Sequence, residues 1–580
     1  MTRRALHFAL TSIVSASLIS AALAQSPDSK STLLSDILSG RTGLSDVKVV
    51  APPESFFEKY REGEEREIAQ KFYKKFVDVG GLSLAASGDV ADEALQRTHY
   101  LVTHLLAGRP DVLGAMQKTG TRLIIIGKDQ VYTDMPEYRN SRNPTFQNER
   151  VRGTGGFRVT SFGEENLLNL PIDRYDDESI GLHEFCHTID AAIGSIDPTW
   201  RGRLSQTYRN AVEKGRWKFA YTGSNQAEYW AEICQSYFDT NRINNWNHQA
   251  VATREQLKEY DPEGYELVRV TFNLSPENDF RYVPLRKQPS VISPPEKFHI
   301  DAYYPKFTWA REFIVLGTPQ TSDEALLKAN DTIRKMFAYR HDILKALIND
   351  GTKMVVLGPG QSLADLPEFK EAKTQAGFDN ARYFDYTPDK KLLVVPEENI
   401  LGGPADPFRG ESSVVRAMAK AAHFLCGSRD HDPKFDTVGG GTQQYEQQLV
   451  WNKGSIPIKR LDVEFDLRLR KLYDESMAKG LWKGTPASRG RTEYWAAGVE
   501  AYFDAAGPNY PPTDPVRHTV RLYDKDDHDR TIESSADIVV ANRPINTREA
   551  LKAYDPLLYA LVDETMLYTG HQDWRYKPNQ

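Results

Sequence analysis

Two histidines and a glutamate stand at a spacing that is typical of zinc-binding helices. The segment SIGLHEFCHTIDAAIG has helical periodicity and contains His183, Glu184 and His187. Because residues four apart lie one turn apart on the same helix face, both imidazoles can reach one zinc ion. Glu184 is adjacent to that face, where it can accept a proton from a water molecule on the metal. A helix that carries this five-residue pattern by chance is the alternative.

A second segment supplies acidic groups that such a zinc site needs. Tyr221 is followed by Asn225, Glu228 and Glu232, and the two glutamates again share one helix face. One carboxylate can complete the ligand set of a catalytic zinc, and the other can accept the free ring N–H of a ligating histidine. A solvated pair of glutamates is the alternative. Asp190, on the first helix, is either a further support for a ligand or a polar group on the helix surface.

These segments resemble a known group of enzymes, the gluzincin metallopeptidases. Within that group, HEFCHTID followed by the Tyr-x3-Asn-x2-Glu-x3-Glu arrangement is similar to the catalytic domain of anthrax lethal factor and its secreted relatives. The segment RGTGGFRVTSFGEENLLNLP resembles a wider set of secreted hydrolases of the same kind. The resemblance covers residues 153–261 well and the flanks loosely.

The resemblance implies a role for each position that matches. It makes His183, His187 and Glu228 the ligands of one zinc ion, and it makes Glu184 the general base. Tyr221 falls where the group has a tyrosine near the substrate, able to donate a hydrogen bond to the developing oxyanion. A tyrosine that only packs against its neighbours is the alternative at this position.

The implied reaction is zinc-dependent hydrolysis, and the amide bond of a peptide is the substrate that fits best. Residues 157–160 follow three glycines and are expected to form a strand, either an edge that pairs with an extended peptide or an ordinary internal strand. A zinc hydrolase of another amide or ester, and a non-catalytic binding protein with a structural zinc, are the competing functions. Glu184 argues against the last, since a closed structural site has no use for a base.

The sequence segments that are expected to form the helices and strands around these residues occur twice along the chain. GTRLIIIGKDQVYTDMPEY from residue 120 matches GTKMVVLGPGQSLADLPEF from residue 351, an offset of 231. KGRWKFAYTGSNQAEYWAEICQSYFD from 214 matches KGLWKGTPASRGRTEYWAAGVEAYFD from 479, and TREQLKEYDPEGY from 253 matches TREALKAYDPLLY from 547. Three matches in the same order indicate duplication of a whole domain, and the rising offset locates insertions in the second copy.

We therefore predict an α+β fold made of two zincin-like domains in tandem. The predicted division is a signal peptide, a polar N-terminal extension, a catalytic domain, a proline-rich linker and a degenerate second domain: 1–24, 25–58, 59–288, 289–296 and 297–580. The prolines of the linker favour an extended, semi-rigid connection.

The second copy lacks most residues of the predicted metal site. In the repeat, His183 corresponds to Arg416, Glu184 to Ala417, His187 to Lys420, Tyr221 to Pro486 and Glu232 to Ala497, while Glu228 is kept as Glu493. A guanidinium and an ammonium group cannot bind zinc at ordinary pH, so this domain is expected to be silent and to stabilise, orient or recognise. Arg416 or Lys420 is expected to pair with Glu493 in place of the ion. Charges that have drifted to face solvent are the alternative.

The start of the chain and its charge bear on location and partners. MTRRALHFALTSIVSASLISAALAQS places two arginines before an apolar stretch that ends in Ala-Leu-Ala, which predicts a signal peptide and export to the periplasm or the extracellular space. No later segment is long and apolar enough to span a bilayer. The net charge of −7 and the absence of long basic runs do not indicate nucleic acid, so the expected partner is a peptide or protein substrate.

The chain has three cysteines, and two of them lie close to the predicted ligands. Cys186 and Cys234 are on helices that should pack together, where they form either a disulfide or two small buried thiols. Cys186 is also where the sequence departs from the gluzincin pattern, since relatives often have a small residue there. Its side chain is expected to point away from the histidine face.

Overall fold

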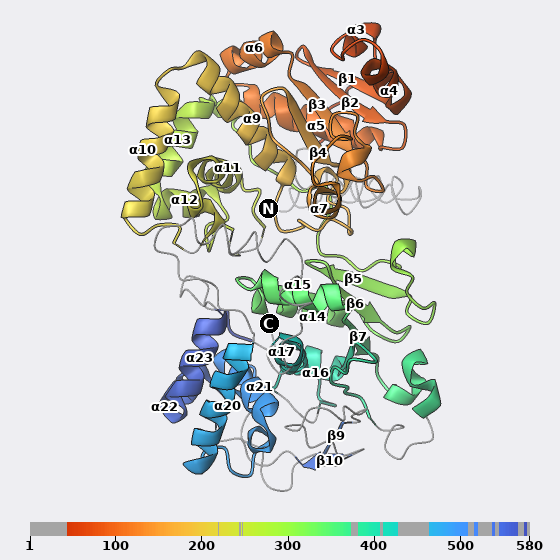
Figure 1. Cartoon of the computed structure of the whole chain (residues 1–580), viewed down its shortest axis with the longest axis vertical. Helices are drawn as coiled ribbons and strands as arrows, with labels where there is room; N and C mark the ends of the chain where they lie inside the picture. The colour runs from red at the N-terminus through yellow and green to blue at the C-terminus, as the bar shows by residue number, and fades with distance from the viewer. Residues whose placement is uncertain are drawn as a thin grey trace, which may run out of the picture.

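The computed structural model has a mixed helix and strand composition with two small mixed sheets, in agreement with the predicted α+β class. It describes residues 43–218, 220–242, 245, 247–372, 381–406, 410–426, 463–507, 516–519, 536–539, 545–566 and 574–576. The predicted signal peptide and residues 25–42 lie outside this described part. In Figure 1 the first half of the chain is at the top and the second half at the bottom.

The first half places a four-stranded sheet beside a set of helices (Figure 1). Its strands are β1 (Tyr73–Val79), β2 (Leu82–Ser87), β3 (Arg122–Ile126) and β4 (Val159–Gly163). Its helices are α3 (Glu54–Phe57), α4 (Glu64–Phe72), α5 (Asp92–Leu106), α6 (Pro110–Thr119), α7 (Pro144–Arg150), α8 (Glu164–Leu167), α9 (Ile180–Ile196), α10 (Trp200–Glu213), α11 (Gln226–Tyr237), α12 (Arg254–Tyr260) and α13 (Pro262–Phe272).

The sheet of the first half runs in the order β1-β2-β3-β4, which makes β4 an edge strand. β1 and β2 are antiparallel, whereas β2, β3 and β4 are parallel neighbours. Gly80 and Gly81 form the tight turn between β1 and β2 with φ angles of 58° and 86°. Glycine suits both places, because two-residue hairpin turns of this kind need positive φ at both residues. All six residues of β2 are buried, as expected for a strand covered on both faces.

The second half repeats this order of elements. Its sheet consists of β5 (Lys306–Ala310), β6 (Phe313–Gly317), β7 (Lys353–Leu357) and β8 (Leu392–Pro396), again one antiparallel pair followed by parallel neighbours. Its helices are α14 (Asp323–Met336), α15 (His341–Asp350), α16 (Glu397–Leu401), α17 (Ser413–Cys426), α20 (Val463–Ala478), α21 (Arg491–Tyr502), α22 (Arg548–Tyr554) and α23 (Pro556–Met566). β9 (Val516–Thr519) and β10 (Ala536–Val539) form a separate antiparallel pair.

Residues next to two of the predicted boundaries pack against the sheets. The polar extension predicted to end at residue 58 includes Phe56 and Phe57, which are buried with Tyr73 in one apolar cluster. Their cluster includes Ile124 of β3, so packing against the sheet removes these aromatic side chains from water. In the linker, Ile292 pairs with Phe307 of β5 and so extends the second half's sheet by one bridge.

The two halves touch through buried charged groups. Arg334 of α14 forms an ion pair with Asp176 of the first half, and both side chains are buried. Tyr339 lies in a small apolar cluster against Tyr221. Among the described residues, no helix has the length and apolar character needed to cross a membrane.

Candidate metal centre

Helix α9 presents both histidines of the predicted motif. Ser179 caps the helix, since its hydroxyl accepts a hydrogen bond from the Leu182 N–H at 3.4 Å. Leu182, Phe185 and Ile189 are buried in the core of the first half and fix the rotation of the helix. The opposite face therefore directs His183 and His187 toward α11.

Helix α11 brings the predicted carboxylate ligand to the same place. Asn225 caps it, with its side-chain oxygen accepting from the N–H groups of Ala227 at 2.9 Å and Glu228 at 3.0 Å. The cap places Glu228 in the first turn, where the helix dipole favours an anion. The Trp230 indole N–H donates to the backbone oxygen of Cys186 at 2.8 Å and so joins α11 to α9.

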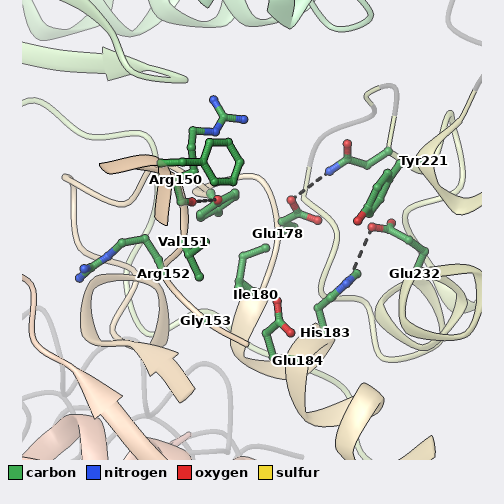
Figure 2. A pocket seen from close by; sticks show the side chains of 13 residues that line it. Arg150, Val151, Arg152, Gly153, Glu178, Ile180, His183, Glu184, Tyr221 and Glu232 are labelled. Carbon is green, nitrogen blue, oxygen red and sulfur yellow. Dashed lines mark hydrogen bonds and ion pairs between the residues drawn. The ribbon is translucent and has the colours of Figure 1, made fainter. Parts of the chain in front are cut away.

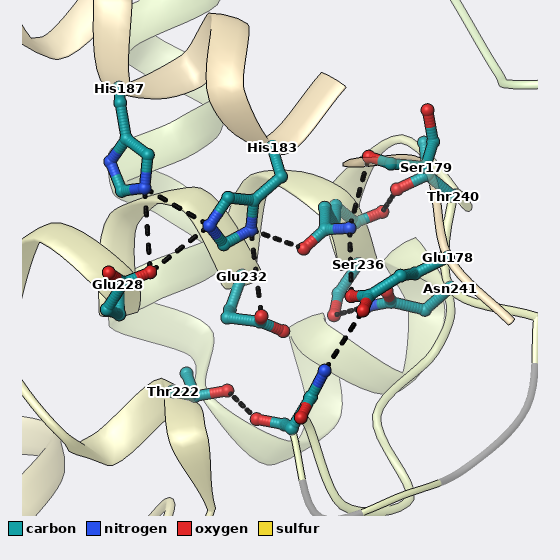
Figure 3. A network of polar contacts seen from close by, with 12 residues as sticks. Glu178, Ser179, His183, His187, Thr222, Glu228, Glu232, Ser236, Thr240 and Asn241 are labelled. Carbon is teal, nitrogen blue, oxygen red and sulfur yellow. Dashed lines mark hydrogen bonds and ion pairs between the residues drawn. The ribbon is translucent and has the colours of Figure 1, made fainter. Parts of the chain in front are cut away.

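The three predicted ligand atoms converge, as Figure 3 shows. His183 Nε2 lies 3.1 Å from His187 Nε2 and 3.1 Å from Glu228 Oε2, and His187 Nε2 lies 3.5 Å from the same oxygen. Ligand atoms about 2.0–2.2 Å from a tetrahedral zinc stand roughly 3.3 Å apart. The spacing and the donor types therefore fit one zinc ion.

The second ring nitrogen of His183 is held by a residue that the sequence analysis did not select. His183 Nδ1 lies 2.8 Å from Gln235 Oε1, whereas the Glu232 carboxylate lies 3.6 Å from the same nitrogen. An amide oxygen can only accept, so Nδ1 carries a proton, and Nε2 is the ring nitrogen that faces the common point. Glu232 is thus a buried neighbour of His183, and Gln235 is the hydrogen-bond partner of the His183 ring. The sequence did carry a signal for Gln235, because residues 228, 232 and 235 lie on one face of a helix.

Charge keeps Glu228 in the form that binds a metal. Burial alone would raise the pKa of its carboxyl group, but hydrogen bonds and charge from His183 and His187 hold that pKa well below its usual value. The carboxylate is therefore anionic over the whole physiological range.

A buried carboxyl group behind Gln235 completes the network in Figure 3. The Gln235 side-chain N–H2 donates to Glu178 Oε2 at 3.3 Å and to the Ser179 backbone oxygen at 3.3 Å. Asn247 donates to the other Glu178 oxygen at 3.0 Å. Burial, followed by the charge of Asp177, raises the pKa of Glu178 to about 7. Glu178 therefore links the loop before α9 to the group that orients His183.

Glu184 stands beside the ligands with its carboxylate oriented by the backbone. Its Oε2 accepts a hydrogen bond from the Gly155 N–H at 2.5 Å. A Cβ atom on Gly155 would lie 2.2 Å from the Glu184 backbone oxygen and 2.6 Å from His187 Cβ. Only glycine can make this approach, which explains one glycine of the RGTGG segment.

Tyr221 lies in a short 3-10 turn, Tyr221–Gly223, which Ser224 separates from Asn225, the cap of α11. Burial first, and then the nearby Glu228 carboxylate, raise the pKa of Tyr221 well above its ordinary value. The phenol therefore keeps its proton and can donate a hydrogen bond. Its ring packs against Ala338 and Tyr339 of the second half.

A pocket opens over these groups, and Figure 2 shows the side chains that line it. Phe146, Val151 and Ile180 form an apolar part, and His183, Glu184 and Tyr221 form a polar part. The pocket therefore combines a surface for an apolar side chain with titratable groups that could act on a polar bond.

The strand predicted at residues 157–160 begins at 159 and is β4, the edge strand of the sheet. On its outer side, the chain's own segment forms a single bridge, between Thr154 and Ser161. β4 is thus the last strand in the sheet order, but the backbone N–H and C=O of Ser161 at its centre are paired with Thr154, and residues 160–163 are buried.

Two further predictions concern α9. The Asp190 carboxylate accepts hydrogen bonds from the Trp200 indole at 2.6 Å and from Arg201 at 2.7 Å, so it joins α9 to α10 rather than supporting a ligand. Cys186 and Cys234 are free thiols, both buried, and the disulfide that was one of the two alternatives is not formed. The two thiols lie in hydrogen-bond contact with each other, which raises the pKa of Cys234 beyond the effect of burial.

The expected pairing in the second half is confirmed. Arg416 donates to Glu493, and the Lys420 ammonium lies 2.7 Å from the other Glu493 oxygen. Arg416 also donates to Glu500 at 2.8 Å, at the position that corresponds to Gln235. Lys420 has a second ion pair with Asp385. Two cations thus hold the helices α17 and α21 together where the first half has its three candidate ligands.

Comparisons of the chain with protein-family models, with curated proteins and with solved structures found no match.

Proposed function

We propose that this protein is an exported zinc metallopeptidase of the gluzincin kind, with one zinc ion in its first half. The observation that carries the proposal is the convergence of two imidazoles and a carboxylate at tetrahedral spacing, with Glu184 beside them in a pocket. A purely structural zinc site would not need that carboxylate next to the ligand face. Export is proposed from the basic, apolar and small-residue order of the first 24 residues.

Zinc, when bound by His183, His187 and Glu228, supplies a Lewis acid that lowers the pKa of water and polarises a carbonyl group. Glu184 would take the proton of the attacking water at its carboxylate and deliver it to the leaving amine. The Gly155 N–H holds that carboxylate in place before the substrate arrives. The protonated Tyr221 hydroxyl would donate a hydrogen bond to the oxyanion.

A peptide is favoured as the substrate by the resemblance of the HExxH and Tyr-x3-Asn-x2-Glu-x3-Glu segments to metallopeptidases. The apolar part of the pocket, formed by Phe146, Val151 and Ile180, would take a side chain next to the scissile bond. The sequence preference of the enzyme would then arise in this part of the pocket.

We further propose that the chain is a tandem duplication in which the second copy has lost its metal. Support comes from contacts that recur at matched positions, beyond the common strand order. The recurring pairs are Trp217 with Asp261 and Trp482 with Asp555, Arg152 with Glu165 and Arg382 with Glu398, and Arg281 with Asp239 and Arg575 with Asp504. In the second copy the ion pairs of Arg416 and Lys420 would replace the ion as the link between helices.

The proposal is tested by metal analysis of the purified protein together with digestion of an unbiased peptide library. Glu184→Gln should keep zinc and lose cleavage by at least about 100-fold, because general-base catalysis typically contributes 10²–10⁴-fold. Glu213→Gln, at an exposed position of α10, is the control and should keep both. Cleavage that survives Glu184→Gln would remove the base from its role. An unmodified protein without bound zinc would refute the metal site.

A further inference from the structure

The turn between β5 and β6 carries two charged residues in a conformation that favours glycine. Arg311 and Glu312 have φ angles of 50° and 75°. The matching turn of the first half, at the offset of 231, has Gly80 and Gly81 with the same signs of φ. Long side chains in this region cost free energy, so they persist where surrounding contacts hold them. The contacts of these two side chains therefore indicate what stabilises the turn.

Both side chains of the turn reach the loop that leads into α9. The Arg311 guanidinium lies 3.9 Å from the Asp177 carboxylate, an electrostatic contact at the outer limit of an ion pair, and both groups are buried. Glu312 lies 3.5 Å from Arg174 in the same loop and 3.2 Å from Lys345 of α15. Each charged side chain of the turn thus faces a side chain of opposite charge in the loop: Arg311 faces Asp177, and Glu312 faces Arg174.

Arg334 adds a stronger contact to the same loop from helix α14. Its guanidinium donates to the Asp176 carboxylate at 2.5 Å, and both side chains are buried. Burial alone would raise the pKa of Asp177, but Arg311, Arg334 and Arg242 together hold it below its usual value. Two of those three arginines belong to the second half, so this half supplies much of the charge that keeps Asp177 anionic.

The loop is in turn connected to a metal ligand by hydrogen bonds. Arg242 of the first half donates to the backbone oxygens of Tyr175, Asp176 and Glu178 and so fixes its path. Glu178 then accepts from Gln235, and Gln235 accepts from His183 Nδ1. A displacement of the acidic loop would be transmitted to the imidazole through two hydrogen bonds.

We propose that the second half acts as an internal clamp, in which Arg334 and the Arg311–Glu312 turn hold the loop 173–178 and thereby position His183. These three are positioning residues and none of them contacts the reacting atoms. The inference rests on the proposed zinc site, and it assigns the silent half a task that its own lost site cannot provide. It also accounts for two charged residues standing where the first half has glycines.

The test uses the full chain and compares Arg334→Gln, Arg334→Lys and the double variant Arg311→Gly with Glu312→Gly. The double variant restores the glycines of the first half, so it relieves the backbone while removing the charges. Arg382→Gln is the matched control, because Arg382 pairs with Glu398 inside the second half. The readouts are zinc affinity by chelator competition, the visible spectrum of the Co²⁺ form, and amide hydrogen exchange of residues 173–178 in the metal-free protein.

Arg334→Gln and the double variant should each lower zinc affinity about tenfold, the lower end of the effect of losing a partner behind a ligand. They should also shift the Co²⁺ spectrum and speed exchange in the loop. Arg334→Lys should restore most of the affinity, and Arg382→Gln should change none of the three readouts. If Arg334→Gln does not fold, the double variant decides alone.

Unchanged affinity, spectrum and loop exchange in a protein that binds zinc would overturn the clamp and leave the proposed function intact. An unmodified protein that binds no zinc would instead refute the proposed function. In that case the exchange of the loop still decides whether the second half holds it.

Discussion

The approach of the Gly155 backbone to α9 decides how Glu184 is held. The Gly155→Ala variant would place a Cβ atom 2.2 Å from a backbone oxygen, which cannot move aside as a flexible side chain can. We expect a loss of about 1–3 kcal/mol in the free energy of unfolding, together with weaker zinc binding and slower cleavage. Denaturant unfolding and a zinc titration measure these effects.

Gly202→Ala is the control for that substitution. Gly202 lies in α10, and beyond its chain neighbours and the backbone of its own helix no atom is within 4 Å of an added Cβ, so alanine should stabilise the protein by about 0.5–1 kcal/mol. A Gly155→Ala protein as stable and as active as the unmodified one would show that the loop around Gly155 can move away from α9.

Stability at acid pH should depend on a histidine next to the pocket. His248 is buried, and that burial, with a contribution from Arg311, lowers its pKa to about 4. As the pH falls below about 6.5 the unfolded chain takes up the proton before the folded one does. The stability due to the neutral ring is therefore complete above pH 6.5 and is lost toward pH 4, by about 3 kcal/mol.

His248→Leu should flatten the pH dependence of the free energy of unfolding between pH 6.5 and 4. The comparison with the unmodified protein isolates this group from the carboxyl groups that titrate in the same range. Parallel curves for the two proteins would mean that water reaches the ring.

At the scale of elements, the sequence predicts the framework of the site well. The apolar runs after residues 120 and 351 are strands β3 and β7, and the HExxH segment is helix α9. These signals are local, since they arise from side-chain period and spacing within one element. Gln235 and Gly155 were not selected, because their roles depend on which atoms two separate elements bring together.

The buried ion pairs between α17 and α21 lead to a prediction about the second half. Arg416→Met keeps the side-chain volume but leaves Glu493 and Glu500 buried without their shared cation. Such a loss typically costs about 3–5 kcal/mol, which should appear as earlier unfolding of peptides from these helices in hydrogen exchange. Arg468→Met is the control, since its pair with Glu564 is partly exposed and should contribute about 1 kcal/mol or less. Equal stability of both variants would mean that the buried pairs do not hold the helices.

At the scale of the whole molecule, the contacts between the halves were beyond prediction. Arg334 and Asp176 are 158 residues apart in the chain, and neither the repeat nor helical periodicity says which surfaces of two domains meet. The repeat predicted that the halves resemble each other. It could not predict that the replaced glycines of one half would contact a loop of the other.

Removal of the metal should destabilise the first half of the molecule more than the second. A ligand present at 1,000 times its dissociation constant stabilises the state that binds it by about 4 kcal/mol. We therefore expect a chelator to lower the unfolding temperature of the first half and to speed exchange in α9 and α11, while α17 and α21 respond less. A His183→Ala variant should be insensitive to the chelator. A second half that loses as much stability as the first would indicate that metal binding is shared.

The facing thiols of Cys186 and Cys234 make the metal centre accessible to a direct measurement. Both are buried between the two helices that carry the three candidate ligands, so a thiol reagent can reach them only when those helices separate. With Cys426 replaced by serine, the rate of thiol labelling reports how often α9 and α11 separate. The measurement needs no substrate, and a metal that slows the labelling would be identified as the ion that binds between these helices.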